Sequence, residues 1–324
     1  MLLVEPGAPL VLGDIPIPEP KAGEVLTKVT ACGFCRTDVH IADGELPAHR
    51  LPLLPGHEIV CTVAAAGAEV QGFAPGDRVG VPWLGGTCGA CPYCLAGREN
   101  VCDAPEFTGY DRDGEYAEYC VARAAHLVRL PAGGSDDHVA PLLCAGLVGF
   151  RSYRHAGAVH RLGLIGFGAA AHIITQLACA DGVEICVFTR PGDAAAQRLA
   201  LELGANWAGG TDQFLPAALD AVIIFAPSGD LMPLGLRLCE KGGRVVCAGI
   251  HMSDIPSFPY VDLWGEREIV SVANLTRSDA IDFFAHPGLA SLRTRVTSYR
   301  LEEANQAMND LRRGRIRGAA VLTI

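Results

Sequence analysis

Two patterns of apolar residues divide the chain. Up to about residue 140, short runs alternate apolar and polar positions between Gly- and Pro-rich breaks, at 24–31, 57–66 and 116–128. Such runs predict antiparallel strands of a small barrel-like domain. From about residue 141 the runs are almost entirely apolar, at 161–167, 184–189, 221–226, 243–249 and 267–273. Runs of this second kind predict buried parallel strands.

Helical stretches fall between the apolar runs, at 193–205 and 231–241, and Gly204 is placed to end the first of them. Strand–helix alternation of this kind is typical of a doubly wound sheet. A charged helix at 302–314 and a strand at 319–324 follow. The length of 324 residues suits two domains, and with 50% apolar residues the chain can bury a large core.

Four cysteines lie in one stretch with the spacing C-x2-C-x2-C-x7-C: Cys88, Cys91, Cys94 and Cys102. A loop this short, with turns expected at Gly89, Pro92 and Gly97, can fold four thiolates around one tetrahedral ion. An iron–sulfur cluster is the alternative, but the last interval departs from the bacterial C-x2-C-x2-C-x3-C-P spacing. We therefore expect a structural zinc site in a lobe at about 85–103.

A second set of ligand-type residues is spread more widely. Cys35, His57 and Cys144 are weak signals one by one, but carboxylates, Asp38 and Glu58, stand close to the first two. Two cysteines and one histidine leave a fourth position for water or substrate, which is the pattern of a catalytic zinc. Zinc in such a site acts as a Lewis acid on an oxygen.

A glycine turn follows the strand expected at 161–167. Gly166-x-Gly168-x-x-Ala171 matches the dinucleotide fingerprint G-x-G-x-x-G/A, and an apolar helix comes after it. The first glycine makes the turn, the second admits the pyrophosphate, and the small third residue allows helix–strand packing. A pyrophosphate would lie at the helix N-terminus, where free N–H groups and the helix dipole favour an anion.

These pieces stand in the order of a known family. The chain resembles the zinc-dependent alcohol dehydrogenases of the medium-chain dehydrogenase/reductase superfamily, through the motifs GFCRTDVH, LPGHEIV, GDRVG, the four-cysteine lobe, GEYAEYCV, APLLCAG, GFGAAAH and LEEANQAMNDLRRGRIRGAAVL. The resemblance implies an α/β protein with a doubly wound parallel (Rossmann) coenzyme domain and a mostly-β GroES-like catalytic domain. It places the catalytic domain at 1–140, the coenzyme domain at 141–280, and a segment that returns to the catalytic domain at 281–324.

The same resemblance assigns the metal ligands. Cys35, His57 and Cys144 would hold the catalytic zinc, and Glu58 would approach the metal during ligand exchange. Asp38 would orient His57, because a metal-bound imidazole usually donates its second N–H to such a group. With the cysteine lobe, two zinc ions per chain are expected.

The resemblance also implies a proton relay and a substrate pocket. Thr37 would take the proton of the substrate hydroxyl and His40 would pass it to solvent. Arg36 would face the coenzyme pyrophosphate. Trp83 and Leu84 would form walls of the pocket.

Coenzyme choice is predicted from the end of the second apolar strand. NAD-binding sites place Asp or Glu there to hold the ribose hydroxyls, but this chain has Thr189 followed by Arg190. Arg190 offers a cationic fork that matches a phosphate, so NADP(H) is expected in preference to NAD(H). Arg277 is also assigned to coenzyme binding.

Composition limits the remaining classes. A net charge of −10 argues against nucleic acid, and no apolar run is credible as a membrane span. Thirteen cysteines without a recognisable secretory signal indicate a reducing compartment, and we expect a cytoplasmic homo-oligomer, a dimer or tetramer, acting on a small alcohol or aldehyde. The alternatives are a polyol or other secondary-alcohol dehydrogenase, a zinc-free quinone reductase on the same fold, and a non-enzymatic zinc- and nucleotide-binding protein.

Overall fold

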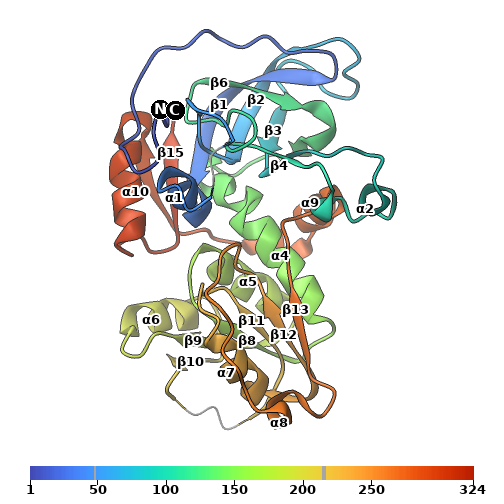
Figure 1. The fold of residues 1–324 in the computed structure, drawn as a ribbon, viewed down its shortest axis with the longest axis vertical. Coiled ribbons are helices and arrows are strands. Elements are labelled where there is room, and N and C mark those ends of the chain that lie inside the picture. Colours follow the sequence, from blue (N-terminus) through green and yellow to red (C-terminus); the bar gives the residue numbers. More distant parts are fainter. Residues whose placement is uncertain (47–48, 214–216) are drawn as a thin grey trace. The chain divides into compact units, whose positions relative to one another are not determined.

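The computed structural model describes residues 1–46, 49–213 and 217–324. The chain divides into two compact units, shown in Figure 1. Unit 1 comprises Met1–Ala145, Asn274–Phe284 and Thr294–Ile324, and unit 2 comprises Gly146–Ala273 and Ala285–Arg293. The first boundary between the two units, at 145/146, lies five residues after the domain boundary expected at 140/141. Among the described residues, no helix combines the length and the apolarity that crossing a bilayer requires.

Unit 1 is built on a seven-stranded sheet in the order β14-β15-β1-β2-β3-β7, with β6 paired to β1. Its strands are β1 (Glu24–Phe34), β2 (Glu58–Ala66), β3 (Arg78–Val81), β6 (Tyr119–Arg123), β7 (Val128–Arg129), β14 (Val296–Arg300) and β15 (Ala319–Thr323). All pairs are antiparallel except β14 with β15. The long β1 therefore has β15 and β2 on its two edges, with β6 also paired to its first part. A smaller sheet pairs β4 (Leu84–Gly86) with β5 (Glu106–Phe107).

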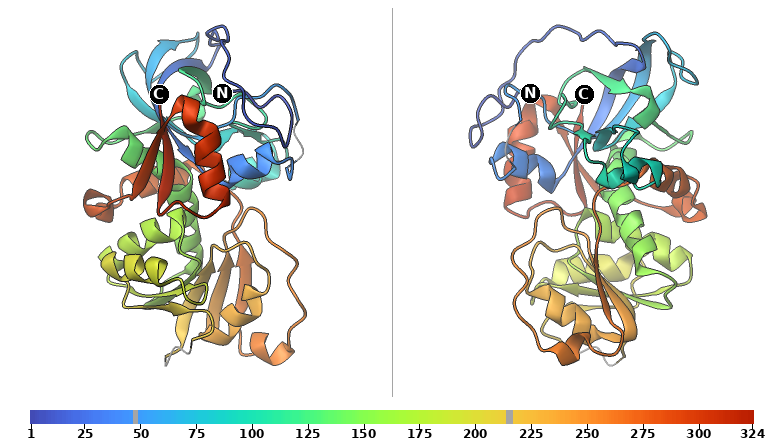
Figure 2. Two further views of the ribbon diagram at one scale, coloured as in Figure 1. Left: turned by 90° about the vertical axis from the view of Figure 1, so that its left-hand side faces the viewer. Right: turned by 45° about the vertical axis from the view of Figure 1, so that its right-hand side comes forward.

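Short helices connect these strands. They are α1 (Arg36–Ala42), α2 (Pro92–Leu95), α3 (Asp136–Val139), α9 (Arg277–Phe284) and α10 (Ala304–Arg312). Figure 2 shows α10 lying beside β14 and β15, which it contacts together with α1. Four 3-10 turns complete the unit, at Glu99–Val101, Ala124–His126, Ala140–Leu143 and Leu301–Glu303. The turn at Ala124–His126 interrupts the run 116–128, which was expected as one strand.

Glu115 is one of several buried acids in unit 1. The Glu115 side chain is fully buried, and one of its oxygens accepts a 3.4 Å hydrogen bond from Thr27 Oγ1 while the other has no partner. Burial raises the pKa of Glu115 to about 8. The carboxyl group is thus protonated over much of the neutral range.

Unit 2 confirms the predicted doubly wound sheet. Six parallel strands stand in the order β10-β9-β8-β11-β12-β13: β8 (Arg161–Ile165), β9 (Glu184–Thr189), β10 (Trp207–Gly210), β11 (Leu219–Ile224), β12 (Cys239–Cys247) and β13 (Glu268–Ser271). The order reverses between β8 and β11, which makes this pair the topological switch point. Ligands of such sheets bind beyond the carboxyl ends of the strands at that point.

The helices of unit 2 are α4 (Ala145–Ala156), α5 (Ala169–Ala180), α6 (Ala194–Glu202), α7 (Leu231–Leu238) and α8 (Tyr260–Leu263), with a 3-10 turn at Pro287–Ser291. Because crossovers between parallel strands are right-handed, the reversal places α5 and α6 on one face of the sheet and α7 on the other. The helix expected at 231–241 ends at Leu238, since Cys239 already begins β12.

Candidate active site and metal centres

The first ligand-type residue stands where β1 turns into α1. Cys35 is the N-cap of α1, and its Sγ accepts a hydrogen bond of 3.2 Å from the Thr37 N–H. In return, Asp38 Oδ2 accepts from the Cys35 N–H at 2.9 Å. This reciprocal capping box fixes the thiol at the helix N-terminus, where the helix dipole favours its thiolate form.

His57 reaches the same point from the start of β2. Its Nε2 lies 3.1 Å from Cys35 Sγ, and its Nδ1 lies 3.2 Å from Asp38 Oδ1. Both side chains are fully buried, and neither Nδ1 nor Oδ1 has another hydrogen-bond partner. The carboxylate is therefore positioned to hold the second ring nitrogen of His57 while the first faces the thiol.

Gly33 makes room for Glu58 at this site. The pairing of β1 with β2 sets Gly33 opposite Glu58, and a Cβ at Gly33 would lie 2.8 Å from Glu58 Cβ and closer still to Oε2. No side chain larger than hydrogen fits there unless the carboxylate moves. The sequence analysis did not identify Gly33, although a glycine inside a strand is a known sign of close approach.

Cys144 completes the cluster after the 3-10 turn at Ala140–Leu143. The ligand atoms of Cys35, His57, Glu58 and Cys144 all lie within 4.8 Å of one another. Two sulfurs and one imidazole nitrogen form the donor set of a catalytic zinc, and the carboxylate supplies a further oxygen. These residues fit the catalytic zinc that the donor types led us to expect.

Burial and mutual contacts determine which groups of this cluster are protonated. Hydrogen bonding with Cys144 and the charge of His57 hold the pKa of Cys35 well below its usual range, although burial acts the other way. The contact with Cys35, together with burial, raises the pKa of Cys144, and burial raises the pKa of Glu58. The group therefore keeps protons that a divalent cation would displace.

The four-cysteine lobe has the geometry expected of a structural site. Cys88, Cys91, Cys94 and Cys102 form the second group whose ligand atoms lie within 4.8 Å among the described residues. Backbone N–H groups point at the sulfurs: Cys88 N lies 3.3 Å from Cys102 Sγ, and Cys91 N lies 3.3 Å from Cys88 Sγ. Gly89 and Gly97 adopt φ of +69°, so two of the predicted turns are present, whereas Pro92, predicted as the third, begins the short helix α2. Hydrogen bonds from the backbone, the Asp103 N–H foremost, lower the pKa of Cys91 to about 6.

A bidentate ion pair fastens this lobe to α9. The Arg277 guanidinium donates to both carboxylate oxygens of Glu99, at 2.6 Å from Nη2 and 3.0 Å from Nε, and its backbone N–H adds a third bond of 2.8 Å. The Glu99 side chain is only 9% exposed. The Arg277 guanidinium, which the sequence analysis assigned to coenzyme binding, thus pairs with Glu99 of the four-cysteine lobe.

Of the predicted relay and pocket residues, Thr37 and Trp83 contact the first cluster. Thr37 is buried in the first turn of α1, and His40, one turn later, has a side chain that is 12% exposed. The ring of Trp83 lies edge-on against His57, with the centroids 4.8 Å apart. Leu84, the residue after Trp83, is also buried. Arg36 is exposed at the start of α1.

The fingerprint lies at the switch point of the unit 2 sheet. Gly166 follows β8 with φ of +90°, and a Cβ there would lie 3.0 Å from Ala226 N, just past β11. Gly168 is the N-cap of α5, and a Cβ on it would meet nothing within 4 Å. Ala171 is fully buried against the sheet. Only small residues allow this turn, and open space remains at the helix N-terminus.

The end of β9 carries no carboxylate. Thr189 is buried, and its Oγ1 accepts from Gln197 Nε2 at 3.0 Å. Arg190 is exposed. The next acid, Asp193, accepts the Ala196 N–H at 3.1 Å as the N-cap of α6, so its carboxylate is committed to that helix.

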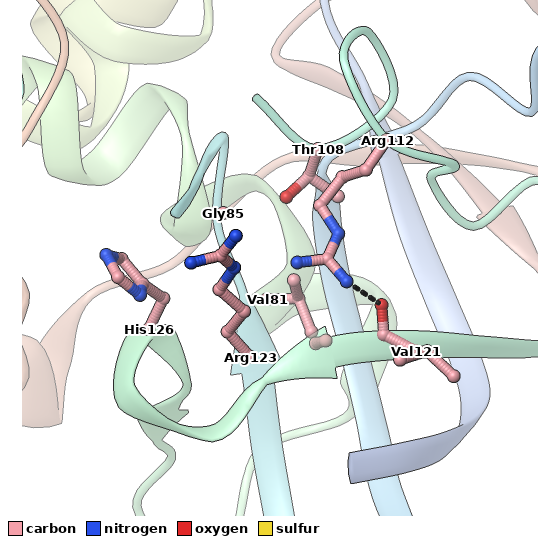
Figure 3. A pocket seen from close by; sticks show the side chains of 8 residues that line it. Val81, Gly85, Thr108, Arg112, Val121, Arg123 and His126 are labelled. Carbon is pink, nitrogen blue, oxygen red and sulfur yellow. Dashed lines mark hydrogen bonds between the residues drawn. The ribbon is translucent and has the colours of Figure 1, made fainter. Parts of the chain in front are cut away.

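A separate hollow in unit 1 is a poor candidate for a ligand site. Figure 3 shows it between Arg112, Arg123 and His126. The hollow is too small to hold a water molecule. Its arginines already pair with acids: Arg112 with Glu24 at 2.9 Å and Arg123 with Glu106 at 2.5 Å.

Comparison with known proteins decides the family. Residues 21–132 match the family model "Alcohol dehydrogenase GroES-like domain". A probable alcohol dehydrogenase AdhA of Mycobacterium tuberculosis is 47% identical over 316 residues, which is 95% of this chain and 91% of the relative. The chain belongs to the zinc-type alcohol dehydrogenases of the medium-chain dehydrogenase/reductase superfamily.

Other relatives of this alcohol dehydrogenase agree along its whole length. An alcohol dehydrogenase of Geobacillus stearothermophilus is 34% identical, with 97% of this chain and 96% of the relative covered. The solved structure of acetophenone reductase from Geotrichum candidum in complex with NAD superimposes with a TM-score of 0.87 at 26% identity, covering 99% and 96% of the two chains. The predicted family and enzyme class are confirmed, and the alcohol dehydrogenase acts on small-molecule alcohols or aldehydes.

Proposed function

We propose that this alcohol dehydrogenase depends on zinc, interconverts primary alcohols and aldehydes, and uses NADP(H) in preference to NAD(H). The observation that carries the proposal is the cluster of two half-buried thiols, at Cys35 and Cys144, with the buried imidazole of His57 and the buried carboxylate of Glu58. A second zinc would be structural, held by the four-cysteine lobe. Metal analysis of purified protein should find two zinc ions per chain, and one or none would contradict the proposal.

The residues of the cluster would act in distinct ways. Cys35, His57 and Cys144 would hold the catalytic zinc, which polarises the substrate oxygen when bound. Glu58 would exchange with an outgoing ligand, and Asp38 would keep the His57 ring in place through its Nδ1. Cys35→Ser should remove one zinc and nearly all activity while the fold persists.

Proton transfer would run along α1. As the alcohol loses a hydride to the nicotinamide, its hydroxyl proton passes to Thr37, which gives its own proton to His40. Aldehyde reduction reverses each transfer. Thr37→Val should leave both zinc ions bound and cripple turnover, because Val has nearly the shape of Thr but no hydroxyl. Wild-type turnover in Thr37→Val would refute the relay.

Preference for NADP(H) rests on the end of β9. Buried Thr189 cannot hold two ribose hydroxyls as a carboxylate does, and Asp193 is occupied as a helix cap. Arg190 is exposed beside them and would pair with a 2′-phosphate. The relatives include both kinds: a putative zinc-binding dehydrogenase of Sinorhizobium meliloti was solved bound to NADP, and the Geotrichum reductase with NAD.

The coenzyme proposal is tested by two substitutions. Arg190→Ala should raise the KM for NADPH far more than that for NADH. Thr189→Asp should shift the preference towards NAD. Equal effects of Arg190→Ala on both coenzymes would show that this residue does not read the phosphate.

The substrate proposal rests on the aromatic surface next to the metal ligands. Trp83 packs edge-on against His57 and stacks on Phe107, with centroids 4.9 Å apart and ring planes 10° apart. A wall of this kind favours apolar substituents and offers a polyol few partners. A panel of primary alcohols, secondary alcohols and polyols with both coenzymes would decide, and a marked preference for polyols would favour the alternative.

Two further expectations belong to this proposal. We place the enzyme in the cytoplasm, because zinc thiolates and many unpaired cysteines need a reducing compartment. We also expect a homo-oligomer, which light scattering of the purified protein would test.

A further inference from the structure

One acidic side chain joins the relay helix from outside it. His40 Nδ1 contacts the carboxylate of Glu45, five residues further along the chain. Thr37 and His40 are three residues apart on α1, so they lie on the same face of the helix. The His40 side chain is 12% exposed and that of Glu45 is 51% exposed. Thr37, His40 and Glu45 thus lead from the buried site to solvent.

The chain after α1 is folded so that this contact is maintained. The N–H groups of Glu45 and Leu46 both donate to the His40 carbonyl, at 2.9 and 3.3 Å. Gly44 adopts φ of +77°, a conformation that only glycine takes readily, and this turn brings the chain back over His40. The carboxylate is therefore presented to the imidazole by the backbone and not by a chance side-chain rotamer.

A carboxylate beside one ring nitrogen determines which nitrogen carries the proton. An ionised carboxylate only accepts hydrogen bonds, so His40 must donate from Nδ1. In the neutral ring, Nε2 is then the acceptor. This tautomer is the one that a relay needs if Nε2 is to receive a proton from the Thr37 hydroxyl.

We propose that Glu45 is a positioning residue of the proton relay, which fixes the tautomer of His40 and conducts the released proton to solvent. The proposal rests on the relay set out under the proposed function. In alcohol oxidation, Thr37 takes the alcohol proton and gives its own to His40 Nε2. The imidazolium then releases one proton through Glu45 to water, and the neutral ring returns to the tautomer in which its remaining proton is on Nδ1. One proton enters and one leaves, and the hydride leaves separately with the coenzyme.

A simpler role would be that of a surface ion pair at a helix end. The same end of α1 provides a matched control, because its C-cap Asp43 also forms an ion pair, with Arg312 of α10. Asp43→Asn removes a charge from the same turn without touching His40. A merely structural role for Glu45 predicts that Glu45→Gln and Asp43→Asn behave alike.

The test measures single-turnover coenzyme reduction with a primary alcohol that the wild type oxidises. Glu45→Gln should slow hydride transfer about tenfold at neutral pH with the alcohol KM changed little, since acid–base steps contribute modest factors where water can substitute. Glu45→Asp, which keeps the charge, should recover part of the rate. Asp43→Asn should stay close to wild type.

A double-mutant cycle separates the two roles. In a His40→Ala background, Glu45→Gln should cost nothing further, because its effect is transmitted through the imidazole. An equal loss in both backgrounds, or a wild-type rate in Glu45→Gln while His40→Ala is slow, would overturn the role of Glu45. If His40→Ala itself keeps the wild-type rate, the relay of the proposed function fails first, and the role of Glu45 fails with it.

Discussion

Replacing Asp38 by Asn tests whether the buried carboxylate strengthens metal binding through His57. The substitution keeps the size of the side chain and removes its charge. Asp38 has two tasks: Oδ2 accepts the Cys35 N–H at 2.9 Å, and Oδ1 lies 3.2 Å from His57 Nδ1. An amide has one oxygen and one NH2 group, so it can accept at only one of these positions.

The magnitude follows from which contact is lost. The capping bond is the shorter one and would keep the amide oxygen, so the NH2 group would turn towards His57 Nδ1. A donor would then face a donor in a place where both side chains are fully buried. Loss of such a partner to a metal-bound histidine typically lowers metal affinity by about 10- to 100-fold, or about 1.4–2.7 kcal/mol.

A chelator competition measures this directly. Zinc release from Asp38→Asn to a chromogenic chelator should show one weakened site and one unchanged site per chain. Asp279→Asn is the matched control, because Asp279 is also buried and caps α9 through the N–H and hydroxyl of Thr276 at 2.8 and 2.7 Å. Two unchanged zinc affinities in Asp38→Asn, or the same loss in Asp279→Asn, would refute the reasoning.

Three further outcomes are expected. Cys91→Ser should lose one zinc and lower the melting temperature, because structural zinc contributes folding energy, whereas Cys179→Ser, a thiol outside both clusters, should keep both zinc ions. The pKa of about 8 at Glu115 lies above the ordinary value of 4.5, so the stability that its proton provides is full below pH 4.5 and is lost as pH rises through 8. Denaturant unfolding should therefore show wild type losing about 2 kcal/mol relative to Glu115→Gln between pH 6 and 8, and parallel curves would contradict this. Arg277→Ala should lower the free energy of unfolding by about 1–2 kcal/mol, since it leaves the buried Glu99 carboxylate without its partner, and the loss should shrink in a Glu99→Gln background.

The fold could be predicted wherever apolar patterns were strong. The runs at 161–167 and 184–189 became β8 and β9 because strands buried on both faces need continuous apolar residues. Strand β10 (Trp207–Gly210) was not predicted, since WAGG carries no strand signal and its conformation comes from pairing with β9. The same holds for β14, whose residues are mostly exposed.

The site was predictable where its chemistry is local in sequence. Four cysteines within fifteen residues identify a metal lobe by spacing alone. The pair of Glu99 and Arg277 joins residues 178 positions apart, and no spacing rule reaches that far. Glu45 is close in sequence to His40, but its proposed role in positioning the imidazole depends on the turn at Gly44, which only the structure shows.

The pairing of β15 with β1 bears on the order in which the enzyme is made. Ala320 and Val321 lie opposite Phe34 and Gly33, immediately before Cys35, a proposed metal ligand. Strand β1 emerges early from the ribosome, whereas β15 follows only after the whole of unit 2. The edge of β1 at Ala31–Phe34, next to Cys35, therefore stays open during most of synthesis, while Gly146–Ala273, the main segment of unit 2, is made before β15 and can fold first. Metal binding at Cys35 should accordingly be a late event. Until β15 is made, the open edge of β1 can pair with a wrong strand.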